Sequence, residues 1–261
     1  MNETLLTIKD LSVTVHDGSE KKILLNRICL DVPSLSIVGL VGGSGSGKTT
    51  TGLAVLKLLS PALKIDDGEI IFQNENLLKI ALSKLQQIRG KAISMIFQEP
   101  LQAFNPVFTI GYQIEEVLVV HTTLNAKQRK EKILSLLDKV GIKDPKRVAG
   151  NYPHQLSGGM RQRAMIAQAI AVDPRLIIAD EPTSNLDVTL QARIMELFLQ
   201  LRDELKLTLL LITHDLGMVS HISDRVAVMN QGQIVEQGIT KEVIENPQQE
   251  YTKKLLGNIK F

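Results

Sequence analysis

The sequence of 261 residues contains one cysteine, carries little net charge and has no long apolar run. The single cysteine, Cys29, excludes an internal disulfide and any iron–sulfur or zinc site built from cysteines alone. We expect it to be a small buried residue of a strand. A net charge of +2 gives no reason to expect nucleic acid or an anionic membrane surface as a partner. The longest apolar stretches, such as residues 207–212, are too short to cross a bilayer. Since the first residues also lack the basic start and apolar run of a signal peptide, we expect a soluble, cytoplasmic protein.

Short apolar runs alternate with helical patterns along most of the chain. With 44% hydrophobic and 22% charged residues, the composition is ordinary for a folded protein. Buried strands that alternate with helices predict an α/β fold with a mostly parallel sheet covered on both faces. Residues 5–15 and 23–32 predict strands of an N-terminal antiparallel part, and Asp66-Asp67-Gly68 predicts a turn before a short strand at 69–72. A mainly helical block, residues 100–171, interrupts the core. The four apolar runs are residues 35–41, 92–97, 176–179 and 207–212.

A glycine-rich loop, here called the phosphate loop, lies between a predicted strand and a predicted helix at 49–59. Its residues 42–49 fit G-x-x-x-x-G-K-[ST] at every fixed position. The glycines let successive N–H groups curl around phosphates, Lys48 reaches the β- and γ-phosphates, and the Thr49 hydroxyl is a ligand for Mg²⁺. The alternative, a glycine-rich turn without a ligand, is disfavoured by the lysine, the threonine and the context. The predicted nucleotide-binding residues are Gly42, Gly43, Ser44, Gly45, Ser46, Gly47, Lys48, Thr49 and Thr50.

Two acidic residues end the apolar strand at 176–179. Solvated carboxylates at a strand end are common, but after a complete phosphate loop a functional interpretation is favoured. Asp180 is then expected to hold Mg²⁺ through its water shell, and Glu181 to polarise the attacking water as general base.

A third segment, Ser157-Gly158-Gly159, comes just before a helical pattern over residues 160–172. A helix start offers unpaired N–H groups and a partial positive charge, which suit a γ-phosphate, and glycines permit a close approach. Arg161 and Arg163 follow on this helix. They suit either phosphate contacts or a solvated, salt-bridged helix face.

In this order, the segments resemble the motifs of ATPases of the ABC transporter family. Residues 156–163 are similar to the family signature, which implies that Ser157, Gly158 and Gly159 bind ATP held on the opposite subunit. Ser184-Asn185-Leu186-Asp187 matches the D-loop, which packs across the dimer interface. The resemblance covers nearly the whole chain and implies a P-loop NTPase core. The implied division is an ABC-type domain at 1–245, with a helical subdomain at roughly 99–172, and a short C-terminal tail at 246–261.

Some residues take their role from the resemblance alone. Gln98 matches the glutamine loop, where it contacts Mg²⁺ or water, and His214 matches the switch histidine, which contacts the γ-phosphate. The family's first strand presents an aromatic ring to adenine. The positions here are Val15 and His16, so we predict weaker discrimination between bases. The expected catalytic residues are Glu181, His214, Gln98 and Lys48, and the expected Mg²⁺ residues are Thr49, Gln98 and Asp180.

A finer resemblance is to the subunits that energise peptide and nickel importers. It rests on Phe97-Gln98-Glu99-Pro100 with Phe104-Asn105-Pro106, on residues 154–163, and on Asn246-Pro247 with Tyr251-Thr252. Many peptide-importer members carry a longer C-terminal extension, some with a four-cysteine cluster. The end at Phe261, with Gly43 where an acid is often found, favours the nickel type.

The resemblance implies an ATP-hydrolysing subunit on the cytoplasmic face of the bacterial membrane that energises import of nickel or short peptides. Its implied partners are a second ATPase subunit, identical or related, two membrane permease subunits and an extracytoplasmic substrate-binding protein, with no nucleic acid. A soluble ABC-type ATPase acting on DNA or ribosomes is the alternative. It lacks support, because the chain shows no long coiled coil, zinc-binding cysteines or second ATPase domain. A regulatory subunit without turnover would need a degraded Lys48, Asp180, Glu181 or His214, and all four are intact.

Overall fold

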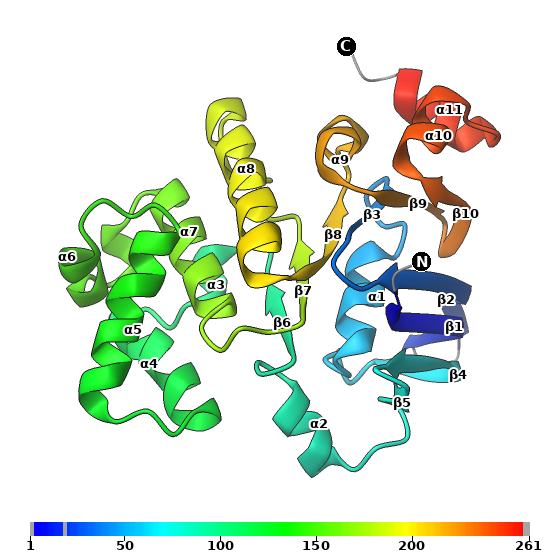
Figure 1. Ribbon diagram of the computed structural model, residues 1–261. Coiled ribbons are helices and arrows are strands. Elements are labelled where there is room, and N and C mark those ends of the chain that lie inside the picture. The colour runs from blue at the N-terminus through cyan, green and yellow to red at the C-terminus, as the bar shows by residue number, and fades with distance from the viewer. Residues whose placement is uncertain (1–2, 18–19, 258–261) are drawn as a thin grey trace. The chain divides into compact units, whose positions relative to one another are not determined.

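The computed structural model describes residues 3–17 and 20–257, without the side chains of 16, 17 and 20 (Figure 1). The chain divides into two compact units. Unit 1 comprises residues 1–86 and 207–261, and unit 2 comprises residues 87–206.

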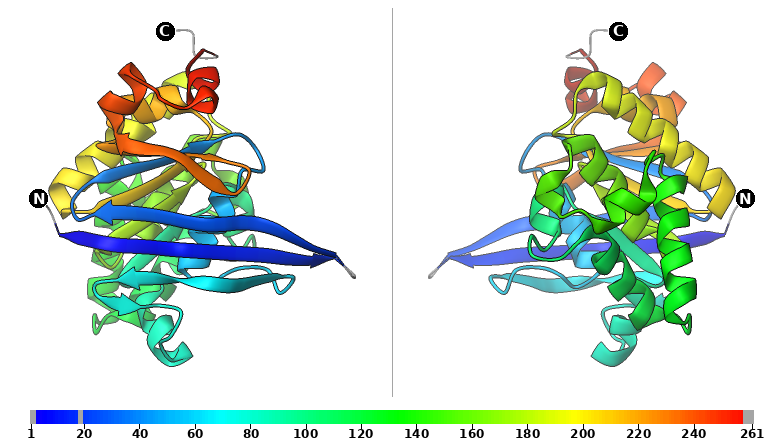
Figure 2. Two further views of the ribbon diagram at one scale, coloured as in Figure 1. Left: turned by 90° about the vertical axis from the view of Figure 1, so that its right-hand side faces the viewer. Right: turned by 90° about the vertical axis from the view of Figure 1, so that its left-hand side faces the viewer.

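Unit 1 contains an antiparallel sheet with the strand order β2-β1-β4-β5. The two longest strands pair over most of their length, and Figure 2 shows them side by side. Apolar residues such as Leu6, Ile8 and Val13 in the first strand are fully buried, because alternate side chains of the sheet face the core. The expected antiparallel strands near the N-terminus are thus confirmed. The strands are β1 (Thr4–Asp17), β2 (Glu20–Pro33), β4 (Leu63–Phe72) and β5 (Glu75–Asn76).

Two expectations for this sheet are wrong. Residues 66–68 do not form a turn between elements. They stay in β4, where a register shift against β1 between the Lys9 and Ser12 pairs absorbs the irregular backbone as a β-bulge. Cys29 is exposed rather than buried. Its neighbours Ile28 and Leu30 take the core-facing positions of β2, so the alternation of the strand turns the thiol outward.

Four further strands of unit 1 have the order β10-β9-β3-β8. The central strand, β3, is buried at every position and is parallel to both β8 and β9. Burial on both faces explains the continuous apolar run in its sequence. The strands β9 and β10 form an antiparallel hairpin, with Gln231 and Gly232 at positive φ in its turn. The bounds are β3 (Ile37–Gly42), β8 (Thr208–Thr213), β9 (Arg225–Asn230) and β10 (Gln233–Ile239).

The helices of unit 1 pack on these strands. The first, α1, begins at Lys48 and ends at Val55, earlier than expected, and Lys57 at positive φ turns the chain away. The helix α9 packs on β3: a Cβ on Gly39 would lie 2.3 Å from a methyl carbon of Val219. The segment expected to be a short C-terminal tail contains a helix, α11. The remaining bounds are α9 (Leu216–Ile222), α10 (Thr240–Glu245) and α11 (Glu250–Gly257), and α2 (Leu82–Ile88) lies at the boundary between the units.

Unit 2 combines a parallel strand pair with most of the helices. The helical block at 100–171 is divided by glycine and proline: Gly141 has positive φ after α5, and Pro145 and Pro153 begin the next two helical segments. Figure 2 shows these helices in green. The bounds are β6 (Ile93–Ile96), α3 (Pro100–Ala103), α4 (Ile110–His121), α5 (Ala126–Lys139), α6 (Pro145–Gly150), the 3-10 helix η1 (Pro153–Gln155), α7 (Gly158–Ala169), β7 (Leu176–Asp180) and α8 (Val188–Leu205).

The strand pairs support the predicted α/β class. Outside the antiparallel sheet β2-β1-β4-β5, the pairs β3–β8, β3–β9 and β6–β7 are parallel and the hairpin β9–β10 is antiparallel. Across residues 3–17 and 20–257, no helix is both long enough and apolar enough to cross a bilayer.

Candidate active site

In unit 1, the phosphate loop and His214 leave the same edge of the sheet. The strand β3 runs directly into the loop, and β8 runs directly into His214. Because the two strands are parallel and Val41 lies opposite Thr213, the segments that follow them emerge together. His214 is exposed, and the next residue, Asp215, caps α9 by accepting a hydrogen bond from the N–H of Met218 at 2.8 Å. This arrangement is consistent with the sequence prediction that the phosphate loop and His214 both contact the phosphates of one nucleotide.

The phosphate loop is held by hydrogen bonds within unit 1. The Lys48 ammonium is buried and donates to the carbonyl oxygens of Gly42 at 2.9 Å and Gly43 at 3.0 Å. The carbonyl of Gly43 also accepts from the N–H of Ser46 at 3.2 Å. From the other side, the N–H of Gly232, in the β9–β10 turn, donates to the Ser46 carbonyl at 2.9 Å. The loop therefore has a defined curvature, with its lysine folded over it.

The loop also has the features that a bound phosphate requires. Gly47 has a φ of +107° and precedes α1 without a side-chain cap, so no side chain occupies the start of that helix. The Oγ atom of Ser46 is buried and has no hydrogen-bond partner within the described part of the chain. A buried hydroxyl without a partner is costly, and a phosphate oxygen would supply the missing acceptor. The loop thus fits the triphosphate of a nucleotide.

In unit 2, Gln98 and the acidic pair leave another common edge. The strands β6 and β7 are parallel, with Ile96 opposite Ala179, so Gln98 and Glu181 both follow the carboxyl end of a strand. Asp180 is 3% exposed and Glu181 9%, although both are acidic. Glu181 has a φ of +47°, a left-handed conformation that is unfavourable for a residue with a side chain. Its carbonyl accepts from the N–H and the hydroxyl of Ser184, which stabilise this backbone turn.

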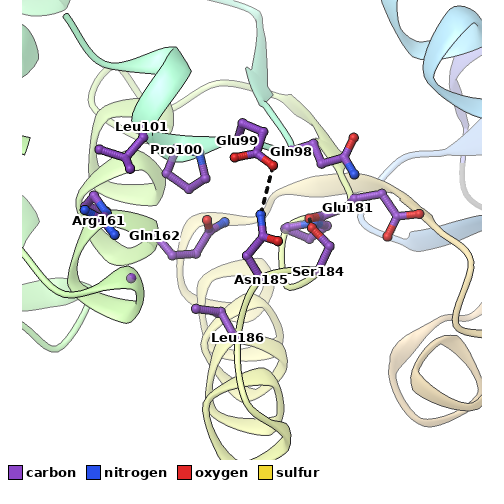
Figure 3. A pocket seen from close by; sticks show the side chains of 12 residues that line it. Gln98, Glu99, Pro100, Leu101, Arg161, Gln162, Glu181, Ser184, Asn185 and Leu186 are labelled. Carbon is purple, nitrogen blue, oxygen red and sulfur yellow. Dashed lines mark hydrogen bonds between the residues drawn. The ribbon is translucent and has the colours of Figure 1, made fainter. Parts of the chain in front are cut away.

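Gln98, Glu181 and Ser184 line a cavity of about 190 Å³ within unit 2 (Figure 3). Gln98 and Glu181 project toward the same side of it, while Leu101 and Arg161 lie toward the other. The wall also includes Gly158, the first residue of α7. The structure therefore brings together three segments that are far apart in the sequence: the loops after β6 and β7 and the start of the signature helix.

Sequence reasoning missed three polar residues of this cavity. The side-chain amide of Asn185 donates to a carboxylate oxygen of Glu99 at 3.1 Å. Gln162 is 2% exposed, and its Nε2 atom has no hydrogen-bond partner in the described residues. Figure 3 shows these three side chains around the same space. Each carried a sequence signal, because Glu99 lies in the matched segment 97–100, Gln162 in the family signature and Asn185 in the segment that matches the D-loop.

The signature segment is arranged as a capped helix start. Ser157 is the N-cap of α7, and its Oγ accepts from the N–H of Met160 at 3.3 Å. Ser157 is exposed and Gly158 half-buried, whereas Gly159 is buried against Leu190 of α8. Ser157 and Gly158 are therefore accessible to a ligand, and Gly159 permits close packing between two helices.

Arg163 has a structural contact. Its guanidinium donates to the carbonyl of Val140, at the end of α5. Burial, together with the charge of Arg193, lowers the pKa of Arg163 below its ordinary value. Arg163 therefore stabilises the turn at the end of α5, which favours a structural role for this arginine over a phosphate contact.

The two expected base-contacting positions lie in β1. Val15 is half-buried and pairs with Lys22 of β2 and Leu63 of β4. His16 pairs through its backbone with Lys21, and its side chain lies outside the described part of the structure. No arrangement of at least three histidine, cysteine or acidic side chains suited to a metal ion occurs among the described residues.

Comparison with known proteins defines the class. The ABC transporter family model matches residues 25–184, which include the phosphate loop, the signature helix and the acidic pair. The chain therefore belongs to the ABC transporter family, and it is an ATPase of the ABC type.

Individual relatives are similar over nearly the whole chain. A peptidoglycan transport ATP-binding protein, YejF of Agrobacterium fabrum, is 44% identical over 98% of the chain, which spans 47% of that protein's length. A dipeptide transport ATP-binding protein, DppD of Haemophilus influenzae, is 44% identical over 98% of the chain and 77% of its own length. Among solved structures, the dimeric ATP-binding cassette MJ0796 bound to ADP and Pi is 27% identical, with a TM-score of 0.81 over 90% of this chain and 98% of that one. This match confirms the fold expected from the sequence.

Proposed function

We propose that this chain is the ATP-hydrolysing subunit of an importer that takes short peptides into the cell. The proposal is carried by the motif residues at the carboxyl ends of parallel strands, the phosphate loop with His214 in unit 1 and Gln98 with Asp180 and Glu181 in unit 2. The peptide cargo is supported by the name of the dipeptide transport relative, which is 44% identical to the chain. The names of the relatives do not support the preference for nickel, which stays a prediction.

The residues of unit 1 would bind the nucleotide. Lys48 lies folded over the loop through two carbonyl contacts, and we infer that it exchanges them for phosphate oxygens when ATP binds. The N–H groups from Gly45 to Thr50 and the Ser46 hydroxyl would complete the cradle. His214 would contact the γ-phosphate from the neighbouring strand end.

The residues of unit 2 would carry the hydrolysis. Glu181 would accept a proton from the attacking water as general base. The left-handed backbone that follows Asp180 aims Glu181 away from the strand direction, so two adjacent acids can take different roles. Thr49, Gln98 and Asp180 offer the oxygen ligands that Mg²⁺ prefers, and the ion would neutralise charge on the phosphates. Ser157 and Gly158 would contact ATP held on a second subunit, identical or related.

A further proposal concerns the membrane partners. A group of apolar side chains, here called the apolar patch, is exposed around α3 and the loop after it. Its members are 39–68% exposed, unusual for large apolar residues that follow one another so closely. We propose that the patch docks against a membrane permease subunit on the cytoplasmic face, with an extracytoplasmic binding protein delivering the cargo. We also propose that the helical block, roughly 99–172 within a domain of 1–245, transmits the motion. The apolar patch consists of Phe97, Leu101, Val107 and Phe108.

Uptake by cells tests the cargo. In cells that lack this chain, a radiolabelled dipeptide and radiolabelled nickel are supplied separately, and the gene is restored as wild type or as Glu181→Gln. Peptide uptake restored by the wild type alone supports the proposal. Restoration of nickel uptake alone would replace peptide by nickel as the cargo. If the deletion changes neither uptake, and ribosome profiles or DNA repair are altered instead, the soluble alternative takes its place.

A further inference from the structure

The C-terminal helix α11 contacts the phosphate loop through one side chain. The hydroxyl of Tyr251 accepts a hydrogen bond from the N–H of Gly43 at 2.9 Å, although 208 positions separate the two residues. Both residues belong to unit 1. This length is typical of a good N–H···O hydrogen bond.

The contact is made at a junction of the loop. Gly43 donates through its N–H to Tyr251 and accepts through its carbonyl from Lys48 and from the N–H of Ser46. Three of the bonds that shape the loop therefore meet at one residue. A Cβ atom on Gly43 would lie 3.0 Å from the Tyr251 hydroxyl oxygen, so the glycine also makes room for the tyrosine.

The helix that carries Tyr251 is itself held at its beginning. The Glu236 carboxylate, on β10, accepts from the N–H groups of Gln248 at 2.8 Å and Gln249 at 3.1 Å. Thr252, the residue after the tyrosine, is fully buried. Because its helix is anchored, Tyr251 can hold the loop rather than follow it.

We propose that Tyr251 is a positioning residue for nucleotide binding, and that it acts through the backbone of Gly43 to keep the phosphate loop in its binding conformation. The inference rests on the proposed role of that loop in binding ATP. A loop that is already curved loses less conformational entropy when the phosphates bind, so the hydroxyl increases affinity without touching the nucleotide. The C-terminal segment is then part of the nucleotide site rather than an appendage.

The test compares the dissociation constant of a non-hydrolysable ATP analogue, measured by calorimetry on the full chain, for wild type and Tyr251→Phe. Losing one hydrogen bond that shapes the loop is expected to weaken binding roughly three- to tenfold. The temperature of unfolding without nucleotide should change little, because the ring remains in place. Tyr112→Phe removes a hydroxyl from an exposed tyrosine of α4 and serves as the matched control, with unchanged affinity.

A double variant tests whether Tyr251 affects nucleotide binding through Gly43. Gly43→Ala should weaken binding, because the added methyl group meets the Tyr251 hydroxyl. If Tyr251 acts through Gly43, adding Tyr251→Phe to Gly43→Ala costs little more or restores part of the affinity. Fully additive losses in the double variant would overturn the proposed route.

Lys48→Ala distinguishes a failure of the proposed role of Tyr251 from a failure of the proposed role of the phosphate loop. If Lys48→Ala loses binding while Tyr251→Phe binds like wild type, the inference about Tyr251 is wrong and the role of the phosphate loop stands. If Lys48→Ala binds the analogue normally, the role of the loop is wrong, and the inference about Tyr251 falls with it.

Discussion

The side-chain amide of Asn185 donates a hydrogen bond to the Glu99 carboxylate over 3.1 Å and so joins the loop after β6 to the loop after β7. The first loop contains Gln98 and the second begins with Glu181, and both are among the proposed active-site residues of unit 2. This pair of side chains therefore connects the two loops directly.

Asn185→Asp should break this link. Two facing carboxylates repel each other, so the loops separate and Glu181 is held less well. Because both groups are at the surface, the effect on ATP turnover is expected to be about threefold at neutral pH. The reciprocal variant Glu99→Gln with Asn185→Asp restores an amide–carboxylate pair. It should regain wild-type turnover, and a double variant as slow as Asn185→Asp would contradict the link.

Glu181→Gln should stop hydrolysis and leave ATP binding intact. Removing a general base typically lowers the rate by a factor of about 10² to 10⁴. A subunit that binds ATP without hydrolysing it is expected to accumulate as an ATP-bound dimer, which light scattering after size-exclusion chromatography would detect. Lys48→Ala is the control that should stay monomeric with Mg-ATP. If Glu181→Gln also stays monomeric, either dimerisation needs a related chain as partner or Glu181 is not the base.

Val15→Tyr should tighten ATP binding. A stacked base–aromatic contact contributes about 1–3 kcal/mol, and Val15 is half-buried at the strand position where we expect the base to lie. Titration with ATP and GTP would show a gain in affinity for both. Val120→Tyr, at an exposed position of α4 in unit 2, is the control for a tyrosine placed elsewhere. Unchanged affinity in Val15→Tyr would show that the base does not lie against β1.

Phe108→Ser should uncouple hydrolysis from uptake. Phe108 is 39% exposed in the apolar patch and its ring stacks on Tyr112, with centroids 4.6 Å apart. Its replacement removes this ring contact and also removes apolar area from the proposed contact with the permease. Peptide uptake is expected to fall severalfold, while the isolated subunit hydrolyses ATP at the wild-type rate. Val119→Ser, outside the patch, controls for the loss of an exposed apolar residue. Equal uptake in the two variants would remove the patch from the proposed interface.

Acid should loosen the C-terminal helix. Burial alone raises the pKa of Glu236, but hydrogen bonds from the Gln248 and Gln249 N–H groups, with the charge of Lys253, hold that pKa below its ordinary value. A carboxyl with a lowered folded-state pKa stabilises the fold above its unfolded-state pKa of about 4.3, and that stabilisation is lost as the pH falls through the folded value. Thermal unfolding of wild type and Glu236→Gln should thus differ near neutral pH and converge under acid conditions. A constant difference across this range would contradict the role of the charge.

The sequence alone predicted the elements whose patterns are local. Fully buried strands such as β3 and β7 appear as continuous apolar runs. Pro145 and Pro153 begin helical segments, because proline suits the first turn of a helix without any distant partner. The phosphate loop could be predicted for the same reason, because its function depends on residues at fixed spacing. The site residues stay predictions in role, although their placement at strand ends agrees with them.

Other features depend on contacts between distant segments. The bulge at residues 66–68 exists because β4 continues to pair with β1, and a turn signal in the sequence cannot report that partner. The contact between Tyr251 and Gly43 and the one between Asn185 and Glu99 join residues 208 and 86 positions apart. Cys29 faces outward because Ile28 and Leu30, on either side of it in β2, face the core. The sequence prediction assigned the cysteine to the wrong face of the strand.

The exposed thiol of Cys29 also provides a single site for labelling with a fluorescent dye. Cys29 is the only cysteine of the chain, is exposed and lies in unit 1, so a maleimide dye would attach at one known position. A second cysteine at Val120, which is 72% exposed in unit 2, would accept a partner dye for energy transfer. The separation of the units could then be followed in single molecules as nucleotide is added and consumed. The strand alternation that turns Cys29 outward supplies this reporter pair without any native cysteine having to be removed.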